Sequence, residues 1–409
     1  KYEQKLYASS NATITEESTQ GHYTIAKPDE TQTYADVLAN INKRFGDYSL
    51  VANVGASIVN NKFEELSYRG PIREKGIPNV FNVFDLDNAK KKARQDEWQE
   101  QTQSIFASVE VGWKSMLYLT LTGRNDWASQ LANSSTSSFF YPSVGLSGVI
   151  SEMIQMPSFI DYMKVRGSFS SVGMPYPRNL TSPTYEYNEA TQSWKPKTHY
   201  PIGDLKPERT DSWEVGLDMK LFKDFNLGLS WYLANTFNQT FDPQISVSSG
   251  YTTIYLQTGY VRNTGLELSL GYGHTWNNNF RWDSNFTLSH NKNKIKELVR
   301  DYVHPETGEL INKNRLDVGG LGKARFILKE GGTLGDLYTQ SDLKRDDNGM
   351  VDIDPTGIVA IENNLPDIKL GSVFPKANLA WSNHFSWKGI SLSALFTARI
   401  GGIVYSATE

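Results

Sequence analysis

The sequence predicts an all-β protein, an antiparallel β-barrel that crosses a membrane with its strands. Two observations support this prediction. Apolar and polar residues alternate over long segments, and the connections between these segments are alternately short turns and long polar loops. The expected strands are about 10 to 13 residues long, whereas globular strands average about 5 to 6 and membrane-spanning strands need about 9 to 11. Strand length therefore favours a membrane.

The amino-acid composition excludes or disfavours several other classes of protein. The 409 residues include 0 Cys, which excludes a disulfide scaffold, a zinc ribbon and a cysteine nucleophile. A net charge of -4 argues against a nucleic-acid-binding surface, and six dispersed His leave little material for a metal site. No apolar run reaches about 18 residues, so no transmembrane helix is expected. The average hydropathy is that of a soluble protein, but β-barrels hide their lipid face in alternation.

Four hairpins show the alternation most clearly along the chain. They join residues 105–113 to 117–124, 215–221 to 225–233, 266–272 to 280–288, and 377–381 to 390–398. In the first, Ile105, Val109 and Val111 share one phase, and Glu110 carries the only charge on the other. Over the whole chain the pattern gives about sixteen strands with consistent up and down directions.

The connections between strands are unequal. Tight turns are expected near Phe45, Lys114, Asp224, Asn278 and Lys388, and long polar connections at 61–101, 174–208, 294–323 and 343–375. Outer-membrane barrels have this asymmetry, with short periplasmic turns and long outer loops. Residues 151–162 predict a helical turn at the periplasmic rim, and the charged residues 88–103 are interpreted as part of a loop excursion.

Charged residues gather on the phase opposite the apolar series, because lipid does not tolerate charge near its midplane. These candidate lumen-lining residues are Glu110, Arg124, Lys164, Arg166, Glu214, Asp218, Lys220, Glu267, Arg281, Asp283 and Arg399. The alternative is the solvated face of a large soluble β-sandwich or propeller. Tryptophans and a tyrosine lie mostly near strand ends, as in an interfacial aromatic belt, or else are scattered core aromatics. They are Trp113, Trp231, Tyr272, Trp276, Trp282, Trp381 and Trp387.

Local patterns do not add a chemical site. The acidic run 346–354 fails as a calcium loop, because alignment on Gly349 puts Lys344 at the first ligand position and Pro355 at the bidentate one. No Ser/His/Asp or paired-carboxylate constellation can be argued from position. We therefore predict no catalytic residue, no metal and no cofactor.

Short motifs follow one another along the chain from Gly123 onward. The motifs are Gly123 to Trp127, Phe139 to Ser147, Lys164 to Phe169, Leu205 to Thr210 with Glu214 to Gly216, Asn263 to Leu268, Asn291 to Ile295, and the stretch from Phe374-Pro375-Lys376 to Gly402. In this order they resemble the barrel motifs of SusC/RagA-type TonB-dependent transporters. Each motif is short, but the ordered series over residues 100 to 405 is specific.

The resemblance implies that residues 1–409 form an incomplete barrel, with about sixteen of an expected 22 strands. A plug domain, a TonB box and the last strands are expected outside this chain. The implied protein sits in the bacterial outer membrane and is no enzyme. It imports oligosaccharides, other glycans or oligopeptides with energy from TonB–ExbB–ExbD, reached through the missing N-terminal region. A SusD-like surface lipoprotein serves as its lid.

Exposed loop aromatics are the candidate contacts for ligand or lid, because such rings can stack on sugar faces. They are Trp127, Tyr176, Tyr185, Tyr187 and Trp194. Their alternative role is packing within loops. Two other functions stay open: a passive porin or receptor-only barrel, which a plug domain would exclude, and a soluble all-β carbohydrate-binding or hydrolytic protein, which strand length and loop asymmetry disfavour.

Overall fold

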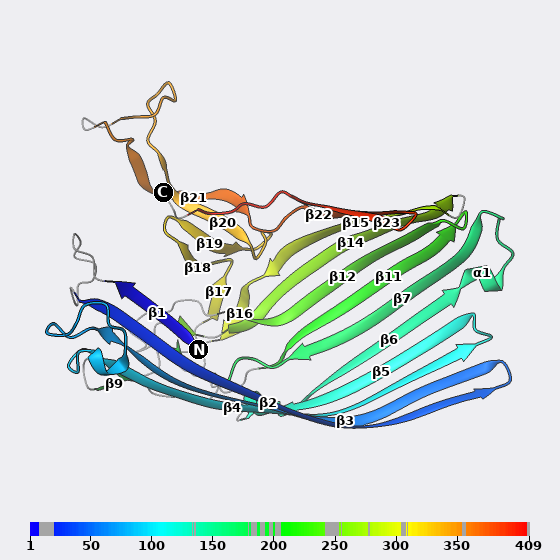
Figure 1. The fold of residues 1–409 in the computed structure, drawn as a ribbon, viewed down its shortest axis with the longest axis horizontal. Coiled ribbons are helices and arrows are strands. Elements are labelled where there is room, and N and C mark those ends of the chain that lie inside the picture. Colours follow the sequence, from blue (N-terminus) through cyan, green and yellow to red (C-terminus); the bar gives the residue numbers. More distant parts are fainter. Residues whose placement is uncertain are drawn as a thin grey trace. The chain divides into compact units, whose positions relative to one another are not determined.

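The computed structural model is built almost wholly from β-strands (Figure 1). It describes residues 1–7, 20–132, 134, 136–178, 180, 186–188, 193–195, 199–200, 206–241, 253–254, 256–276, 279–303, 308, 310–353 and 357–406. No helix among these residues is long and apolar enough to cross a membrane. The all-β, antiparallel prediction is confirmed.

The described residues include a 13-stranded main sheet in the order β1-β2-β3-β4-β5-β6-β7-β11-β12-β14-β15-β22-β23. Its strands are β1 (Tyr2–Tyr7), β2 (Gly21–Phe45), β3 (Tyr48–Pro71), β4 (Lys92–Trp113), β5 (Leu117–Ala128), β6 (Phe139–Val149), β7 (Ile160–Met174), β11 (Glu208–Leu221), β12 (Phe225–Phe241), β14 (Leu256–Trp276), β15 (Phe280–Glu297), β22 (Ala377–Trp387) and β23 (Ile390–Ile400). Sequence neighbours are sheet neighbours throughout, which is the up-and-down order of a barrel wall.

Smaller sheets occupy the long connections. A four-stranded sheet, here called the loop subdomain, consists of β18 (Arg315–Leu321), β19 (Ala324–Lys329), β20 (Asp336–Leu343) and β21 (Ile361–Ser372). Among the described residues, two-stranded sheets pair β8 (Glu186–Asn188) with β9 (Ser193–Lys195), β10 (His199–Tyr200) with β13 (Thr253–Ile254), and β16 (Val299–Val303) with β17 (Leu310–Lys313). The short helices are η1 (Val83–Asp85), η2 (Ser129–Leu131) and α1 (Ile150–Met153), the last within the predicted periplasmic turn.

The chain divides into two compact units. Unit 1 comprises Lys1–Leu38, Gly55–Ile105 and Asp126–Ser129, and unit 2 comprises Ala39–Val54, Phe106–Asn125 and Gln130–Glu409. In unit 1, Tyr23, Ile72 and Leu86 are buried. In unit 2, most fully buried apolar side chains come from the end of β15 and from β16 to β20, such as Ile295, Leu298 and Ile327. The long strands thus carry little of the buried core that is described.

The tight turns near Phe45, Lys114, Asp224 and Lys388 lie where the sequence predicts them, and Asn278 lies outside the described residues. Lys388 and Gly389 join β22 to β23 with φ values of 45° and 89°. Positive φ at both positions is the type I′ geometry that follows the twist of the flanking strands. Lys114 and Lys223 also have positive φ in the turns after β4 and β11. The predicted asymmetry of short turns and long connections is confirmed.

Strand lengths differ from the prediction. β2, β3 and β4 span 25, 24 and 22 residues, so residues 61–71 and 92–101 are strand and not loop. The interpretation of residues 88–103 as a loop excursion is wrong from Lys92 onward. Beyond the apolar stretch both faces of these strands are polar, so the sequence loses its alternation while the backbone ladder continues.

The apolar phase is exposed. In unit 2, Trp213 and Val215 on β11 are 54% and 53% exposed, and Leu392 on β23 is 64% exposed. A soluble sandwich would bury this phase against a second sheet. We call it the apolar face, and it also carries Leu229, Leu268 and Phe286 through the strand register.

Candidate functional site: the polar face of the barrel wall

The opposite phase of the same strands forms a polar face. Strand register aligns Arg166 with Gly216, Gly216 with Ser230, and Ser230 with Glu267, so side chains from β7, β11, β12 and β14 lie in one row. The register continues through Ser289 on β15 and Asn378 on β22 to Arg399 on β23. The polar residues that alternate with apolar ones in the sequence therefore form one polar surface in unit 2.

Arg166 is the centre of a charged network on this face. Its Nη1 donates to Asp218 Oδ2 at 2.7 Å, and its Nη2 donates to Glu214 Oε1 at 3.1 Å and to Ser230 Oγ at 2.6 Å. The network thus ties three strands together through side chains. A charged network of this kind is costly in lipid and is expected where water or protein lies against the strands.

Gly216 makes room for this network. A Cβ at Gly216 would lie 2.6 Å from Arg166 Cζ, because the guanidinium lies against the glycine backbone. Gly265 has the same relation to the Tyr232 ring, with which its Cβ would collide. Both glycines belong to the motifs Glu214 to Gly216 and Asn263 to Leu268. The motif glycines therefore have a packing role on the polar face.

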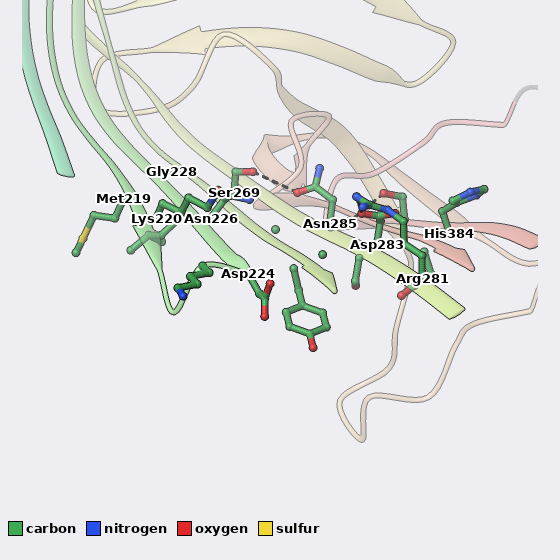
Figure 2. A pocket seen from close by; sticks show the side chains of 18 of the residues that line it. Met219, Lys220, Asp224, Asn226, Gly228, Ser269, Arg281, Asp283, Asn285 and His384 are labelled. Carbon is green, nitrogen blue, oxygen red and sulfur yellow. Dashed lines mark hydrogen bonds and ion pairs between the residues drawn. The ribbon is translucent and has the colours of Figure 1, made fainter. Parts of the chain in front are cut away.

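The larger cavity on the polar face has a volume of about 1080 Å³ (Figure 2). Lys220, Arg281, Asp283, Asn285 and His384 are among the side chains that line it. The Arg281 guanidinium donates to both Asp283 oxygens, at 2.7 and 2.6 Å. Figure 2 also shows the contact from Ser269 Oγ to Asn285 Oδ1, at 3.4 Å. This cavity combines paired charges with amide and hydroxyl groups.

A second cavity of about 620 Å³ lies further along the same strands. Its lining includes Arg166, Asp218, Glu267 and Arg399 together with hydroxyl and amide side chains. Arg399 Nη2 donates to the Val373 carbonyl at 2.6 Å. Donors and acceptors of both kinds are therefore displayed along a strand-lined wall, which suits hydrogen bonding to a polymer with many polar groups.

The structure brings most of the predicted lumen-lining residues together. Seven of them line the two cavities: Arg166, Asp218, Lys220, Glu267, Arg281, Asp283 and Arg399. Glu214 bonds to Arg166, and Lys164 stands opposite Asp218 in the register. On the β4–β5 hairpin, Glu110 accepts from Thr120 at 3.3 Å and Arg124 lies 5.8 Å from the Phe106 ring centre. That all of them face a lumen remains a prediction.

Neutral residues of the polar face were missed by the charge-based prediction. They include Ser230, Asn226, Ser269, Asn285, Ser382, His384 and Ser393. Their phase was the available signal, since each shares the strand parity of a charged residue in its own or a neighbouring strand.

The candidate ligand or lid aromatics lie in different settings. Trp127 is within β5, is 41% exposed and lines a cavity of about 510 Å³ with Gln101, Gln103 and Ile105 in unit 1. Tyr176 is only 4% exposed, and its hydroxyl has no hydrogen-bond partner among the described residues. Tyr187 and Trp194 stand opposite each other in the β8–β9 pair. Tyr185 lies outside the described residues.

Aromatic rings form a continuous series at the turn ends of the strands in unit 2. Phe159 and Phe222 have ring centres 5.6 Å apart, and Phe225 and Tyr272 4.7 Å apart. The series continues through Trp282 to Phe385, at 5.2 and 5.9 Å between ring centres. A row of this kind along one end of an exposed apolar band is typical of a membrane interface.

An exposed apolar face, an opposing polar face and an aromatic row at the turn ends define the wall of an outer-membrane β-barrel. The family model described as "TonB dependent receptor-like, beta-barrel" matches residues 2–349. The chain belongs to this family, whose members lie in the bacterial outer membrane.

The relatives and solved structures agree with this assignment. TonB-dependent receptors P39 and P26 of Formosa agariphila are each 25% identical, over 74% and 80% of this chain and 28% and 34% of their own length. The chain thus spans about a third of these relatives. The RagAB peptide importer matches with TM-scores of 0.72 in its "closed-closed" state and 0.73 in its "open-open" state, at 18% and 17% identity. These matches cover 93% and 98% of this chain and 42% and 43% of the solved chains.

Proposed function

We propose that the whole protein is a TonB-energised importer of large nutrients, either oligosaccharides and other glycans or oligopeptides. The described strands supply part of the barrel wall, and the long connections supply extracellular loops. The observation that carries the proposal is the polar face, where two cavities and paired charges lie behind an exposed apolar face. This segment performs no covalent chemistry in our proposal.

The polar face is proposed to line the lumen and to contact a plug domain from the part of the protein outside this chain. Supporting this, hydroxyl and amide groups lie beside the paired charges of the Arg166 network and the Arg281–Asp283 pair. Such a surface can exchange hydrogen bonds with a moving polypeptide or a passing substrate without stranding a buried charge.

A SusD-like surface lipoprotein is the proposed partner, and TonB–ExbB–ExbD the proposed energy source. Trp127, Tyr187 and Trp194 are the proposed contacts for ligand or lid, together with Tyr185 and Tyr176. The similarity in fold to a peptide importer supports an oligopeptide as one of the two substrate classes. Charges of both signs on the polar face are compatible with either class.

The test is isolation of the full-length protein from native membranes in mild detergent, followed by mass identification of what copurifies. We expect a SusD-like lipoprotein at equal stoichiometry. The genes beside that of the lipoprotein should indicate whether the substrate is a glycan or a peptide. Uptake of that substrate should stop when TonB is deleted. Recovery of the barrel alone, with uptake that persists without TonB, would instead identify a passive porin.

A further inference from the structure

The end of β15 carries a row of lysines on the outward phase. Lys292 and Lys294 are exposed and Lys296 is partly exposed, whereas Asn293 is 9% and Ile295 0% exposed between them. Period two thus puts Lys292 and Lys294 on one side of the strand and the buried residues on the other. Lys296 follows them at an irregularity in the register against β14. With Arg262 of β14, these lysines form what we call the basic patch.

The basic patch continues the apolar face beyond its end. The phase of Phe286 and Leu288 on β15 runs on through His290 to Lys292 and Lys294 without a register shift against β14. Lys292 lies four residues past Leu288, or about 13 Å along the strand. It lies on the side of the long connections, which is the extracellular side of an outer-membrane barrel.

Like charges face each other directly in the basic patch. Arg262 stands opposite Lys294 in the β14–β15 register. Two cations opposite each other destabilise a strand pair unless an anion neutralises them. The Arg262 guanidinium has only neutral partners among the described residues, with Nε donating to Asn235 Oδ1 at 2.9 Å and Nη2 to Tyr260 Oη at 2.5 Å.

The lysines also have no carboxylate partner in the described part of the chain. Ion pairs do form nearby, between Arg209 and Asp211 and between Arg300 and Glu297, but none includes Lys292, Lys294 or Lys296. Lys296 lies beyond the apolar face, and its pKa is lowered by partial burial and then by Arg262, Lys294 and Lys292. The arrangement concentrates positive charge without a counterion from the described residues.

We propose that the basic patch binds the phosphate groups of an anionic lipid in the outer leaflet of the membrane. The patch begins where the apolar face ends, so the acyl chains of such a lipid would lie against Leu266 and Leu288 while its phosphates meet Arg262 and the lysines. This inference depends on the barrel being embedded in the membrane and not on what it transports. The occupant is a phosphorylated glycolipid of the kind that fills the outer leaflet of Gram-negative bacteria.

The test titrates the full-length protein in detergent with lipid A and measures binding by native mass spectrometry. The variant combines Lys292→Gln, Lys294→Gln and Lys296→Gln. The matched control combines Lys114→Gln, Lys223→Gln and Lys388→Gln, which removes the same charge from the turn ends of strands. We expect at least a roughly tenfold loss of lipid A binding in the patch variant and less than about twofold in the control.

Two further arms identify the ligand. Lipid A stripped of its phosphates should bind wild type as weakly as lipid A binds the patch variant. Inorganic phosphate alone should neither bind measurably nor displace lipid A. Equal lipid A binding by wild type and both triple variants would overturn the proposal, as would binding of inorganic phosphate without lipid. The single variant Lys294→Gln, expected to have an intermediate effect, gives the same readout if the triple variant fails to fold.

Discussion

At the scale of single residues, the polar face depends on glycines as much as on charges. Gly216 gives the Arg166 guanidinium a place against the backbone, and Gly265 does the same for the Tyr232 ring. Tyr232 Oη reaches Asn291 Oδ1 at 3.3 Å from that position. Because glycine has no side chain, a large side chain from the neighbouring strand can lie over it. The Tyr232 ring over Gly265 resembles the rescue of strand glycines by aromatic rings.

Gly216→Ala tests this role. The added Cβ would lie 2.6 Å from Arg166 Cζ, so the guanidinium must leave Glu214, Asp218 or Ser230. We expect the free energy of unfolding to fall by about 1 to 2 kcal/mol, because the displaced guanidinium loses hydrogen bonds to charged groups. The measurement is guanidinium-induced unfolding of the full-length protein in detergent.

Gly228→Ala is the matched control on the neighbouring strand. Its Cβ would meet Ser269 Cβ at 3.6 Å, which is an ordinary contact. We expect a change of less than about 1 kcal/mol, since only the backbone entropy term differs. A loss of stability equal to that of Gly216→Ala would show that Arg166 has no special need of the glycine.

Charged residues of the polar face were predictable from the sequence, and their neutral partners were not. Charge on one phase of an apolar alternation has few explanations, so Arg166, Asp218 and Asp283 were found directly. Ser230 and Asn285 have no such signal, because serine and asparagine occur on either face of a strand end. Their part in the site follows only from cross-strand register.

At the scale of elements, the sequence predicted hairpins better than strand ends. Turn chemistry and alternation located the turns at Lys114 and Lys388, but β2 and β3 run about a dozen residues beyond the expected strand length. Backbone hydrogen bonding continues there without an apolar phase. The loop subdomain was missed for a related reason: its strands are short, and the buried side chains of β19 occur as a cluster rather than in alternation.

Asp367 is the charged centre of the loop subdomain. Its carboxylate accepts from Arg315 at 2.6 and 2.9 Å, from Lys329 at 2.9 Å and from Gln340 at 3.0 Å. The Arg315 hydrogen bonds above all hold its pKa well below the usual range, although burial opposes this. Asp367 therefore links β18, β19 and β20 to β21.

Asp367→Asn is expected to destabilise the loop subdomain by about 1 to 2 kcal/mol, because two partly exposed cations lose their carboxylate partner. Hydrogen exchange of β18 to β21 in the full-length protein measures the loss. Glu362→Gln, an exposed position on the same strand, is the control and should leave exchange unchanged. Equal protection in both variants would contradict a stabilising role for Asp367.

The same carboxylate predicts a pH dependence. Because the folded pKa of Asp367 lies below its unfolded value of about 3.9, its contribution is fully present above that value and is lost as pH falls further. We expect protection of the loop subdomain to decline below about pH 4 in wild type. Asp367→Asn should be insensitive over that interval.

At the scale of the whole molecule, one face of the main sheet is suited to lipid and the opposite face to water or protein. The apolar face is exposed although it is the most hydrophobic surface of the strands, and the aromatic row marks one limit of that surface. This arrangement of an apolar and a polar face is the one expected of a β-barrel of the family to which the chain belongs. Substrate class could not be predicted, because the polar face offers charges of both signs and the chain spans only about a third of the length of its curated relatives.

Adjacent substitutions on β14 test which face meets lipid. Leu270→Arg places a charge on the apolar face, and Ser269→Arg places the same charge on the polar face. We expect Leu270→Arg to cost about 2 to 4 kcal/mol in folding into lipid vesicles. Ser269→Arg should cost less than about 1 kcal/mol. Reversed costs would assign the two faces the other way round.

The pairing of β15 with β22 has a consequence for how this protein can evolve. Ser289 stands opposite Asn378, so the ends of the connection that contains the loop subdomain are held together by the barrel wall itself. Lengthening such a connection costs only about 0.6 kcal/mol for each doubling, provided that its ends stay in place. Natural variation can therefore replace the entire insertion while the wall is inherited unchanged.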